Sequence, residues 1–550
     1  MQNKRSLSGH YILTLLFLFH FLSSFAQTHS IILGRPTDVS ITASIQFDYD
    51  VDCYLEYGTN SGVYTNTIPV FNNTANIPDE KDLQNLMPDT KYYYRMQYRA
   101  VGAVAYTPTA EYSFHTQRAQ GSTYTFTIEA DEHLYDKKGV DNMYRITLEN
   151  EAADNPDFMI TLGDIFGDDH TPSTTTLADM DTLHNAYRPF LSNICHSVPF
   201  YVCLGNHEGE NDYYLDSMPP NNIGVSGTLT RKKYYPNPFP NGFYSGNTVQ
   251  ENFGMDLPEN YYAWTWGDAL FIVLDVYRTE CHDTLVAKPQ GWNWTLGQSQ
   301  YNWLLNTLQS STARYKFVFA HHLRGQGRGA VLEAPLYEWG GYQNTGGSYT
   351  FATHRPGWPM SIHELFVQYG VNIFFQGHDH LFAHEVLDSV TYQEVPMAAD
   401  STYEIGMLAN ADAYTADTLD GTGHLRVTVA PSCVTVDFVR AYLPADTVSG
   451  VHQNREVAFS YTIGNCTSGL SQINSDEVIK IFPNPANSVL SVKLPEGVFK
   501  YKVELVNTLG ESLLHSASNV MDISGIPDGI YLVRVHTDTS EFNRKMIICH

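Results

Sequence analysis

Five clusters of metal-binding side chains follow apolar segments in the middle of the chain. The clusters are Asp131-Glu132-His133, Gly163-Asp164, Gly205-Asn206-His207-Glu208, His321-His322 and Gly377-His378-Asp379-His380. Each cluster alone is weak evidence, because a single histidine at a strand end is more often a satisfied surface residue than a ligand. Together they indicate a site for two divalent or trivalent metal ions, since imidazole and carboxylate groups suit iron, zinc or manganese better than calcium.

A pair of such ions suits the hydrolysis of phosphate esters. A carboxylate can bridge two metal ions held about 3.5–4 Å apart, and the pair activates a water molecule. Phosphoryl transfer needs a nucleophile and neutralisation of charge more than covalent help from the protein. The clusters therefore favour an enzyme that acts on an anionic phosphate ester.

Apolar strands are expected to position these clusters. The five predicted strands are Tyr124–Ile128, Phe158–Leu162, Phe200–Leu204, Phe317–Ala320 and Ile373–Gln376. Helical stretches such as Leu177–Leu191 and Gln298–Leu308 lie between them, so we predict an α/β domain over residues 123–463. Loops at the carboxyl edge of one sheet converge, and residues far apart in sequence can therefore share one site.

The order and local sequence of the clusters, DxH, GDxxx, GNHE, H and GHxH, resemble the calcineurin-like metallophosphoesterase superfamily from Asp131 to His380. The resemblance implies a four-layer fold of two facing β-sheets flanked by helices. It also implies a set of metal ligands: Asp131, His133 and His380 for the first ion, Asn206, His321 and His378 for the second, and Asp164 as the bridge. His322 competes with His321, which we prefer as the first residue past its strand.

Two residues of the third cluster are expected to lie beside the substrate. Asn206 would contact it as well as bind metal, and His207 would donate a proton to the leaving oxygen or stabilise the transition state. Arg324 and Arg328 are the nearest cationic candidates for binding a phosphoryl oxygen. The competing expectation for both arginines is that they are solvated or paired with the abundant carboxylates.

Residues 28–118, in front of this domain, consist of short alternating segments that predict a β-sandwich, and a β-rich module at this place is similar to the arrangement in purple acid phosphatases. In that family a tyrosine three residues after the bridging aspartate ligates ferric iron, whereas this sequence has Gly167 there. The resemblance therefore implies a centre without the violet tyrosine–iron chromophore. Asp168 and Asp169 beyond it are expected to be solvated rather than to support the metal site.

Three functions are weighed from these observations. The first is a secreted phosphatase that hydrolyses phosphate monoesters by attack of a metal-bound hydroxide. The second is a phosphodiesterase acting on nucleotides or glycerophosphodiesters, and the third is a non-catalytic surface-binding or adhesion protein with a vestigial metal centre. The first is favoured over the third because no predicted ligand is missing.

Length and charge exclude some other classes. A chain of 550 residues with 43% hydrophobic residues predicts three or four domains rather than a disordered or disulfide-stapled protein. Its 32 basic and 59 acidic residues give a formal charge of −27, which argues against nucleic acid as the main partner.

The start of the chain predicts export. Residues 1–26 combine a basic start, an apolar run from Tyr11 to Phe21 and small residues at the end, which is typical of a secretory signal peptide. The run is too short to cross a bilayer, so no transmembrane anchor is expected in the mature form. The seven cysteines form no CxxC pair, and Cys195 and Cys203 are expected to be buried packing residues.

Two β-rich modules are predicted on either side of the α/β domain. Residues 28–118 contain short alternating segments, and Leu86 to Arg95 resembles a late-strand signature of fibronectin type III-like modules. Residues 464–476 are a predicted linker and 477–550 a small β-sandwich. The overall prediction is a multidomain chain: an N-terminal β-sandwich, a central four-layer α/β sandwich and a C-terminal small β-sandwich.

The C-terminal module resembles the sorting domain of substrates of the type IX secretion system. The motif PNPA at 483–486, the segment GIYLVRV at 529–535 and a basic last strand from Arg544 to Ile548 carry this resemblance. It implies recognition by the secretion machinery and export through the periplasm and outer membrane of a Gram-negative bacterium. Removal of the domain, followed by release or surface attachment, would complete the process.

Overall fold

The computed structural model describes most of the chain. The described residues are 29–134, 139–166, 174–211, 222–279, 291–324, 327–405, 413–448, 450–466, 480–493, 501–507, 512–516, 518–537 and 541–550. The predicted signal peptide at 1–26, residues 467–476 of the predicted linker, and Gly167, Asp168 and Asp169 lie outside them. The chain forms two compact units, Met1–Ile463 and Gly464–His550. The finer domain bounds given above stay predictions.

The first unit begins with antiparallel β-sheets, as the alternating sequence predicts. One sheet has the order β1-β2-β6 and the other β4-β3-β7-β8, with β5 paired to β3 and β9 to β7. The strands are β1 (His29–Gly34), β2 (Ser40–Phe47), β3 (Val51–Gly58), β4 (Asn66–Thr67), β5 (Phe71–Asn73), β6 (Asp79–Gln84), β7 (Lys91–Ala100), β8 (Thr107–Pro108) and β9 (Tyr112–His115). Side chains from both sheets, such as Ile45, Leu55 and Tyr94, form one buried core.

Two larger sheets follow, with helices in between along the chain. The strands are β10 (Tyr124–Glu129), β11 (Met159–Thr161), β12 (Phe200–Val202), β13 (Ser245–Gly246), β14 (Tyr262–Trp266), β15 (Ala269–Val273), β16 (Tyr315–Phe319), β17 (Ile373–Gln376), β18 (Phe382–Leu387), β19 (Val390–Glu394), β20 (Thr418–Leu419), β21 (Gly423–Ala430), β22 (Cys433–Arg440) and β23 (Val457–Gly464). The helices are α1 (Asp141–Ala153), α2 (Leu177–Leu191), α4 (Ile223–Tyr234), η1 (Gly291–Asn293), α5 (Gly297–Ser310), α6 (Tyr337–Gly340), α7 (Phe351–His354) and α8 (Ile362–Tyr369).

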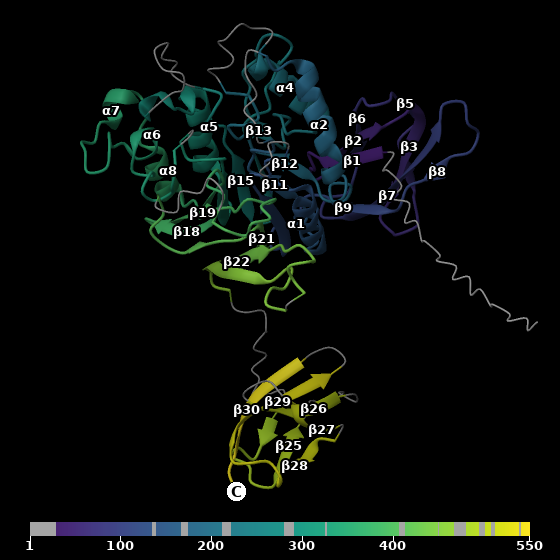
Figure 1. Cartoon of the computed structure of the whole chain (residues 1–550), viewed down its shortest axis with the longest axis vertical. Coiled ribbons are helices and arrows are strands. Elements are labelled where there is room, and N and C mark those ends of the chain that lie inside the picture. The colour runs from purple at the N-terminus through teal and green to yellow at the C-terminus, as the bar shows by residue number, and fades with distance from the viewer. Residues whose placement is uncertain are drawn as a thin grey trace, which may run out of the picture. The chain divides into compact units, whose positions relative to one another are not determined.

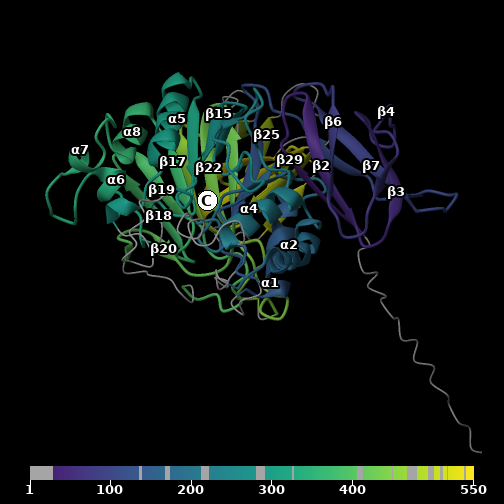
Figure 2. The same cartoon turned by 90° about the horizontal axis from the view of Figure 1, so that it is seen from above.

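These elements form the expected four layers. One sheet has the order β12-β11-β10-β21-β22-β23 and the other β13-β14-β15-β16-β17-β19-β18-β20. Figure 1 shows α5, α6 and α8 on the outer side of the second sheet and α1 and α2 on the outer side of the first. Figure 2 shows the same layers from above, with the N-terminal strands β2, β3, β6 and β7 beside them.

Strict alternation along the strands explains the layering. In β15, Phe271 and Val273 point into the core between the two sheets, whereas Leu270 and Ile272 point to the helical side. Neighbouring side chains of a strand point to opposite faces of the sheet. A strand in which every side chain is apolar must therefore be covered by other elements on both faces. The near-continuous apolar strands of this domain therefore require helices outside each sheet.

Parallel pairing brings the polar clusters to one edge. Strands β10, β11 and β12 run parallel to one another, and so do β15, β16 and β17 in the facing sheet. The carboxyl ends of neighbouring parallel strands lie at the same edge of a sheet. The polar residues that follow these strands therefore lie close together.

The N-terminal sheets are joined to the α/β layers by a buried arginine. Arg188 of α2 donates to the hydroxyls of Ser30 (2.9 Å) and Ser44 (3.0 Å) in β1 and β2. It also donates to the carbonyls of Ser44 (3.0 Å) and Tyr234 (2.6 Å). Burial lowers the pKa of Arg188 to about 10, so the guanidinium remains charged at neutral pH.

The second unit is a small pair of antiparallel sheets, as predicted. Its sheets have the orders β24-β25-β28 and β27-β26-β29-β30. The strands are β24 (Lys480–Phe482), β25 (Val489–Lys493), β26 (Tyr501–Val506), β27 (Ser512–Ser516), β28 (Val520–Asp522), β29 (Gly529–Thr537) and β30 (Glu541–Ile548). The GIYLVRV segment forms β29 and pairs with the last strand, β30.

The structure also tests the predictions about the cysteines and reports on helices that could cross a membrane. Cys195 and Cys203 are buried free thiols, as expected, and Cys53 and Cys549 are also free. Cys433 and Cys466 are disulfide-bonded, which the spacing of the cysteines did not reveal. Among the described residues, none of the helices has the length and hydropathy needed to cross a membrane.

Replacing Arg188 with methionine should destabilise the first unit by about 2–4 kcal/mol, because the buried carbonyls and hydroxyls that it satisfies would lose their donors. The free energy of unfolding, measured by denaturant titration, checks this. The exposed Arg314→Met is the matched control and should change stability by no more than about 0.5 kcal/mol. Equal stability of the two variants would contradict the proposed link.

Candidate metal centre

The carboxyl ends of five strands supply the predicted site residues. Asp131 and His133 follow β10, Asp164 follows β11, and Asn206 and His207 follow β12. In the facing sheet His321 follows β16, and His378 and His380 follow β17. The structure brings six of the seven predicted metal ligands together, namely Asp131, His133, Asp164, His321, His378 and His380. The seventh, Asn206, directly precedes His207, whose backbone N–H donates to Asp164.

One group of side chains gathers around Asp131. The Nε2 atoms of His133 and His380 are 3.0 Å apart. The Nε2 atom of His380 is 3.4 Å from Oδ1 of Asp131, and that of His133 is 3.8 Å from it. These three buried groups can hold a metal ion between them.

A second group gathers around Asp164. The Nε2 atom of His321 is 3.0 Å from Oδ2 of Asp164 and 3.2 Å from Nδ1 of His378. The other ring nitrogen of His321, Nδ1, lies 3.0 Å from the carbonyl oxygen of Leu162, which directs Nε2 into the site. These three residues form a further group able to hold an ion.

Asp164 lies between the two groups. Its Oδ2 atom is also 3.8 Å from Nε2 of His133 and 3.8 Å from Nε2 of His207. The Nε2 atom of His321 in turn lies 3.9 Å from Oδ1 of Asp131. A carboxylate shared in this way is what a bridge between two cations requires.

The donor set fits metal ions. Oδ1 of Asn206 is buried and has no hydrogen-bond partner among the described residues. Buried polar atoms without partners are costly, and ligation of a cation removes that cost. Imidazole and carboxylate donors suit iron, zinc or manganese.

Opposite charges in the site stabilise each other and shift the pKa values of the groups that carry them. Burial alone would lower the pKa of His321, but the negative charge of Asp164 and then that of Asp131 raise it to about 9. Burial alone would raise the pKa of Asp164, but His321 and His207 hold it well below its ordinary value. Asp164 is therefore ionised, as a bridging ligand must be.

Five of the seven predicted ligands have left-handed backbone conformations. The φ angles are 55° for Asp131, 45° for His133, 57° for Asp164, 79° for His378 and 55° for His380. Such conformations cost of order 1–3 kcal/mol each for residues other than glycine, and they cluster at functional sites. The recurrence after β10, β11 and β17 indicates that these three loops are held for ligation rather than for stability.

Two glycines allow the loops to approach one another. A Cβ on Gly205 would lie 2.3 Å from Oδ1 of Asp164, and one on Gly377 would lie 2.6 Å from Oδ2 of Asp131. Side chains at these positions would displace both carboxylates. The glycine before the ligand in the third and fifth clusters is therefore a steric requirement.

Glu208 holds two of the ligand loops together, a role that the sequence reasoning missed. Its buried carboxylate accepts hydrogen bonds from the backbone N–H groups of Gly205 (2.5 Å), Asp164 (3.1 Å) and Ile165 (2.8 Å). Burial and then the charge of Asp164 raise the pKa of Glu208 to about 7. The only sequence signal was its place at the end of the Gly-Asn-His-Glu motif.

A similar network holds the loop of His378 and His380. The carboxylate of Asp379 accepts from Arg328 (2.7 Å), from the backbone N–H of Gly329 (2.8 Å) and from the hydroxyl of Tyr414 (2.7 Å). The N–H of Asp379 donates to the buried Glu394 (3.0 Å). Asp379 therefore points away from the ligands on either side of it and fixes their loop.

The structure gives both arginines protein partners. Arg324 is ion-paired with Glu333, and Arg328 is bonded to Asp379 and to the carbonyl of His378. This is the competing expectation stated above, so a substrate-binding role for either residue stays a prediction. Both ring nitrogens of His322 are also engaged, with Gly329 and Arg324, whereas Nε2 of His321 faces the carboxylates.

His207 lies where the site meets solvent. Its side chain is 14% exposed, whereas that of Asp164 is 2% exposed. Its backbone N–H donates to Oδ1 of Asp164 (2.8 Å), and the imidazole ring packs edge-on against that of His133 at 5.0 Å. Among the clustered groups it is thus placed to meet an incoming ligand.

Comparisons with known proteins agree with this geometry. The family model of calcineurin-like phosphoesterases matches residues 124–382, and that of the secretion system C-terminal sorting domain matches residues 480–549. No curated protein matches the chain.

The solved structure of PhoD has a similar fold. The structure of PhoD shares 16% sequence identity, with a TM-score of 0.54, over 79% of this chain and 90% of PhoD. GAP50, the anchor in the inner membrane complex of Plasmodium, shares 13% identity, with a TM-score of 0.33, over 62% of this chain and 89% of GAP50. Identity this low makes the PhoD match evidence for the fold alone.

The motif order, the clustered ligands and both family matches lead to one identification. The chain carries a calcineurin-like phosphoesterase domain with buried His/Asp clusters consistent with a dinuclear metal site, followed by a sorting domain that directs secretion across the outer membrane.

Proposed function

We propose that the protein is a secreted phosphatase that hydrolyses phosphate monoesters at a dinuclear metal centre. The observation that carries the proposal is the position of Asp164, whose Oδ2 lies within 3.8 Å of ring nitrogens from three different loops. Two cations held there would activate a water molecule and offset the charge of the phosphoryl group. The family implies a phosphate-ester substrate, and the preference for monoesters is our proposal.

The proposed ligands divide into two sets. Asp131, His133 and His380 would hold one ion, and Asn206, His321 and His378 the other, with Asp164 shared. Oδ1 of Asn206 has no hydrogen-bond partner in the part of the chain that the structure describes, which supports its place in the second set. His321 is chosen over His322 because only its Nε2 faces both carboxylates.

His207 would act on the leaving group. Its imidazole is the most exposed of the clustered rings, and its backbone N–H is anchored to Asp164. A proton donor at this position would protonate the departing alkoxide oxygen as the ester bond breaks. Asn206, which precedes it, would contact a phosphoryl oxygen.

The charge of the substrate favours monoesters. The side chains of Asp131, His321 and His380 are at most 2% exposed, so the attraction of cations held between them would be screened little by water. The doubly charged monoester therefore gains more from two cations than the singly charged diester does.

The ester preference can be measured directly. The purified protein should hydrolyse p-nitrophenyl phosphate with a kcat/KM at least about tenfold above that for bis-p-nitrophenyl phosphate, because two cations attract the doubly charged monoester more strongly. Tenfold corresponds to a difference of about 1.4 kcal/mol in the barrier. Assays at matched pH and metal concentration check this. The reverse ratio would favour the phosphodiesterase alternative, and no turnover of either ester would favour the adhesion alternative.

Replacing His207 with alanine should lower kcat by about 10²–10⁴-fold on alkyl phosphates, whose leaving oxygen needs a proton. The loss on p-nitrophenyl phosphate should be much smaller, because nitrophenolate leaves without one. The exposed His452→Ala is the matched control and should keep wild-type rates on both esters. Metal content is measured in parallel, and a variant that loses its metal, or equal losses on both esters, would argue against the proton-donor role.

Deleting residues 477–550 should strand an active enzyme in the periplasm. The second unit is compact by itself, so its removal leaves the phosphoesterase domain intact. Cell fractionation with an activity assay checks the prediction, with the full chain as the secreted reference. Efficient secretion of the shortened chain would contradict the sorting assignment, and loss of specific activity would contradict the independence of the domain.

A further inference from the structure

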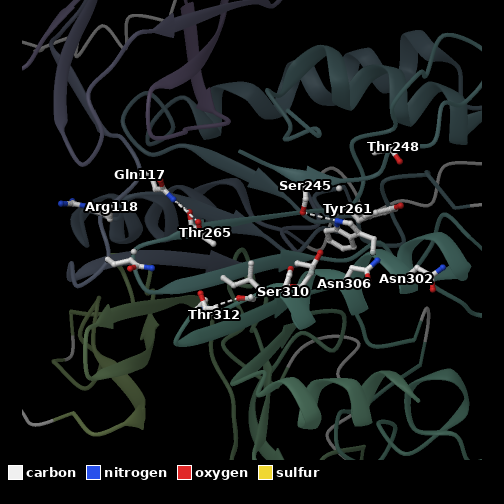
Figure 3. A pocket seen from close by; sticks show the side chains of 18 of the residues that line it. Gln117, Arg118, Ser245, Thr248, Tyr261, Thr265, Asn302, Asn306, Ser310 and Thr312 are labelled. Atoms are coloured by element: carbon white, nitrogen blue, oxygen red, sulfur yellow. Dashed lines mark hydrogen bonds between the residues drawn. The ribbon is translucent and has the colours of Figure 1, made fainter. Parts of the chain in front are cut away.

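A polar groove lies on the phosphoesterase domain away from the metal centre. It has a volume of about 930 Å³ and is bordered by the segment 117–120, which links the N-terminal sheets to β10, by the sheet edge β13–β14 and by α5. Figure 3 shows Gln117 and Thr265 toward one end of the groove and Asn302 and Asn306 toward the other. Junctions between domains of this kind are common places for ligand sites.

The groove is separated from the metal centre by the length of a strand. Its wall includes Gly267 and Ala313, which precede β15 and β16, whereas His321 follows the opposite end of β16. Eight residues of extended chain from Ala313 to His321 span roughly 25 Å. A ligand in the groove would therefore not touch the proposed catalytic residues.

One face of α5 supplies a row of uncharged hydrogen-bonding side chains. The row is Ser299, Asn302, Asn306, Thr307 and Ser310, with Trp303 among them. These positions recur at the three- and four-residue spacing that places side chains on one face of a helix. Amide and hydroxyl groups both donate and accept, which matches the hydroxyl groups of a sugar.

Trp303 provides an aromatic surface in the same groove. The indole is partly buried, its Nε1 donates to Oγ of Ser245 (3.2 Å), and its ring packs against Tyr261 at 4.9 Å. Both rings are thereby held in place while part of the indole remains accessible. Rigid, amphipathic rings of this kind suit ligands with one apolar and one polar face.

The charge of the groove narrows the ligand class. Among the described residues that line it, Arg118 is the only charged one, and its guanidinium is bound twice by Asp157 (2.7 and 2.8 Å). The part of the lining that the structure describes contains no carboxylate, although the chain has 59 acidic residues. A phosphate or an acidic sugar would find no free cation there, and a metal ion would find no anionic ligand.

We propose that this groove binds a neutral oligosaccharide of two or three pyranose units. The sugar faces would pack on Trp303, and the hydroxyl groups would bond to the row of side chains on α5. This goes beyond the proposed phosphatase activity, because it gives the secreted enzyme a second, non-catalytic site. Such a site would hold the enzyme on a polysaccharide while the metal centre acts on phosphate esters.

Calorimetric titration of the full chain tests the proposal with four neutral probes: maltotriose, cellotriose, xylotriose and N,N′,N″-triacetylchitotriose. At least one should bind with a Kd below about 1 mM. Trigalacturonic acid, of the same length but acidic, should bind at least about tenfold more weakly than that probe. Absence of binding by all four neutral probes, or preference for the acidic one, would overturn the proposal.

Variants on α5 separate binding from folding. Trp303→Ala and the exposed Asn306→Ala should each weaken binding by at least about tenfold. Gln309→Ala, exposed on α5 but outside the groove, is the matched control and should bind like the wild type. All three should hydrolyse phosphate esters at wild-type rates, which shows that they fold. Unchanged saccharide binding in both groove variants would overturn the proposal.

Discussion

The position of the Asp164 carboxylate is the constraint on which the rest of the site depends. Its Oδ2 lies 3.0 Å from His321 and 3.8 Å from both His133 and His207, which follow three different strands in two facing sheets. Only parallel strands that end at one edge of each sheet can bring these residues together. The four-layer packing is therefore what makes a shared carboxylate, and hence a two-metal centre, geometrically possible.

The site costs stability, and neighbouring groups offset that cost. Five proposed ligands have φ between 45° and 79°, and two carboxylates lie buried among imidazoles. Glu208 accepts the N–H groups of Gly205, Asp164 and Ile165, and Asp379 ties the last loop to Arg328 and Tyr414. These bonds restrain loops that would otherwise relax, so the ligands are held ready for metal ions rather than assembled around them.

The residues alone were enough to predict the five strands and most of the side chains that cluster at their ends, because apolar strands ending in His, Asp and Asn are a local pattern. The four-layer order came instead from the resemblance to a known family. The sequence could not predict the partners of Arg324 and Arg328, since ion pairs with Glu333 and Asp379 depend on how long loops fold back. Nor could it assign Glu208 to the backbone of the neighbouring loop. The groove beside Trp303 was equally hidden, because its walls come from segments about 180 residues apart that only the tertiary structure joins.

The protein combines one chemistry with one route out of the cell, because a phosphoesterase domain and a sorting domain lie in one chain. In the proposed centre the Asp164 carboxylate would be shared by two metal ions. Elemental analysis of purified wild-type and Asp164→Ala protein, after dialysis against metal-free buffer, tests this most directly. We expect about two transition-metal ions per wild-type chain and almost none in the variant. Two ions retained by Asp164→Ala, or one or none in the wild type, would contradict this expectation.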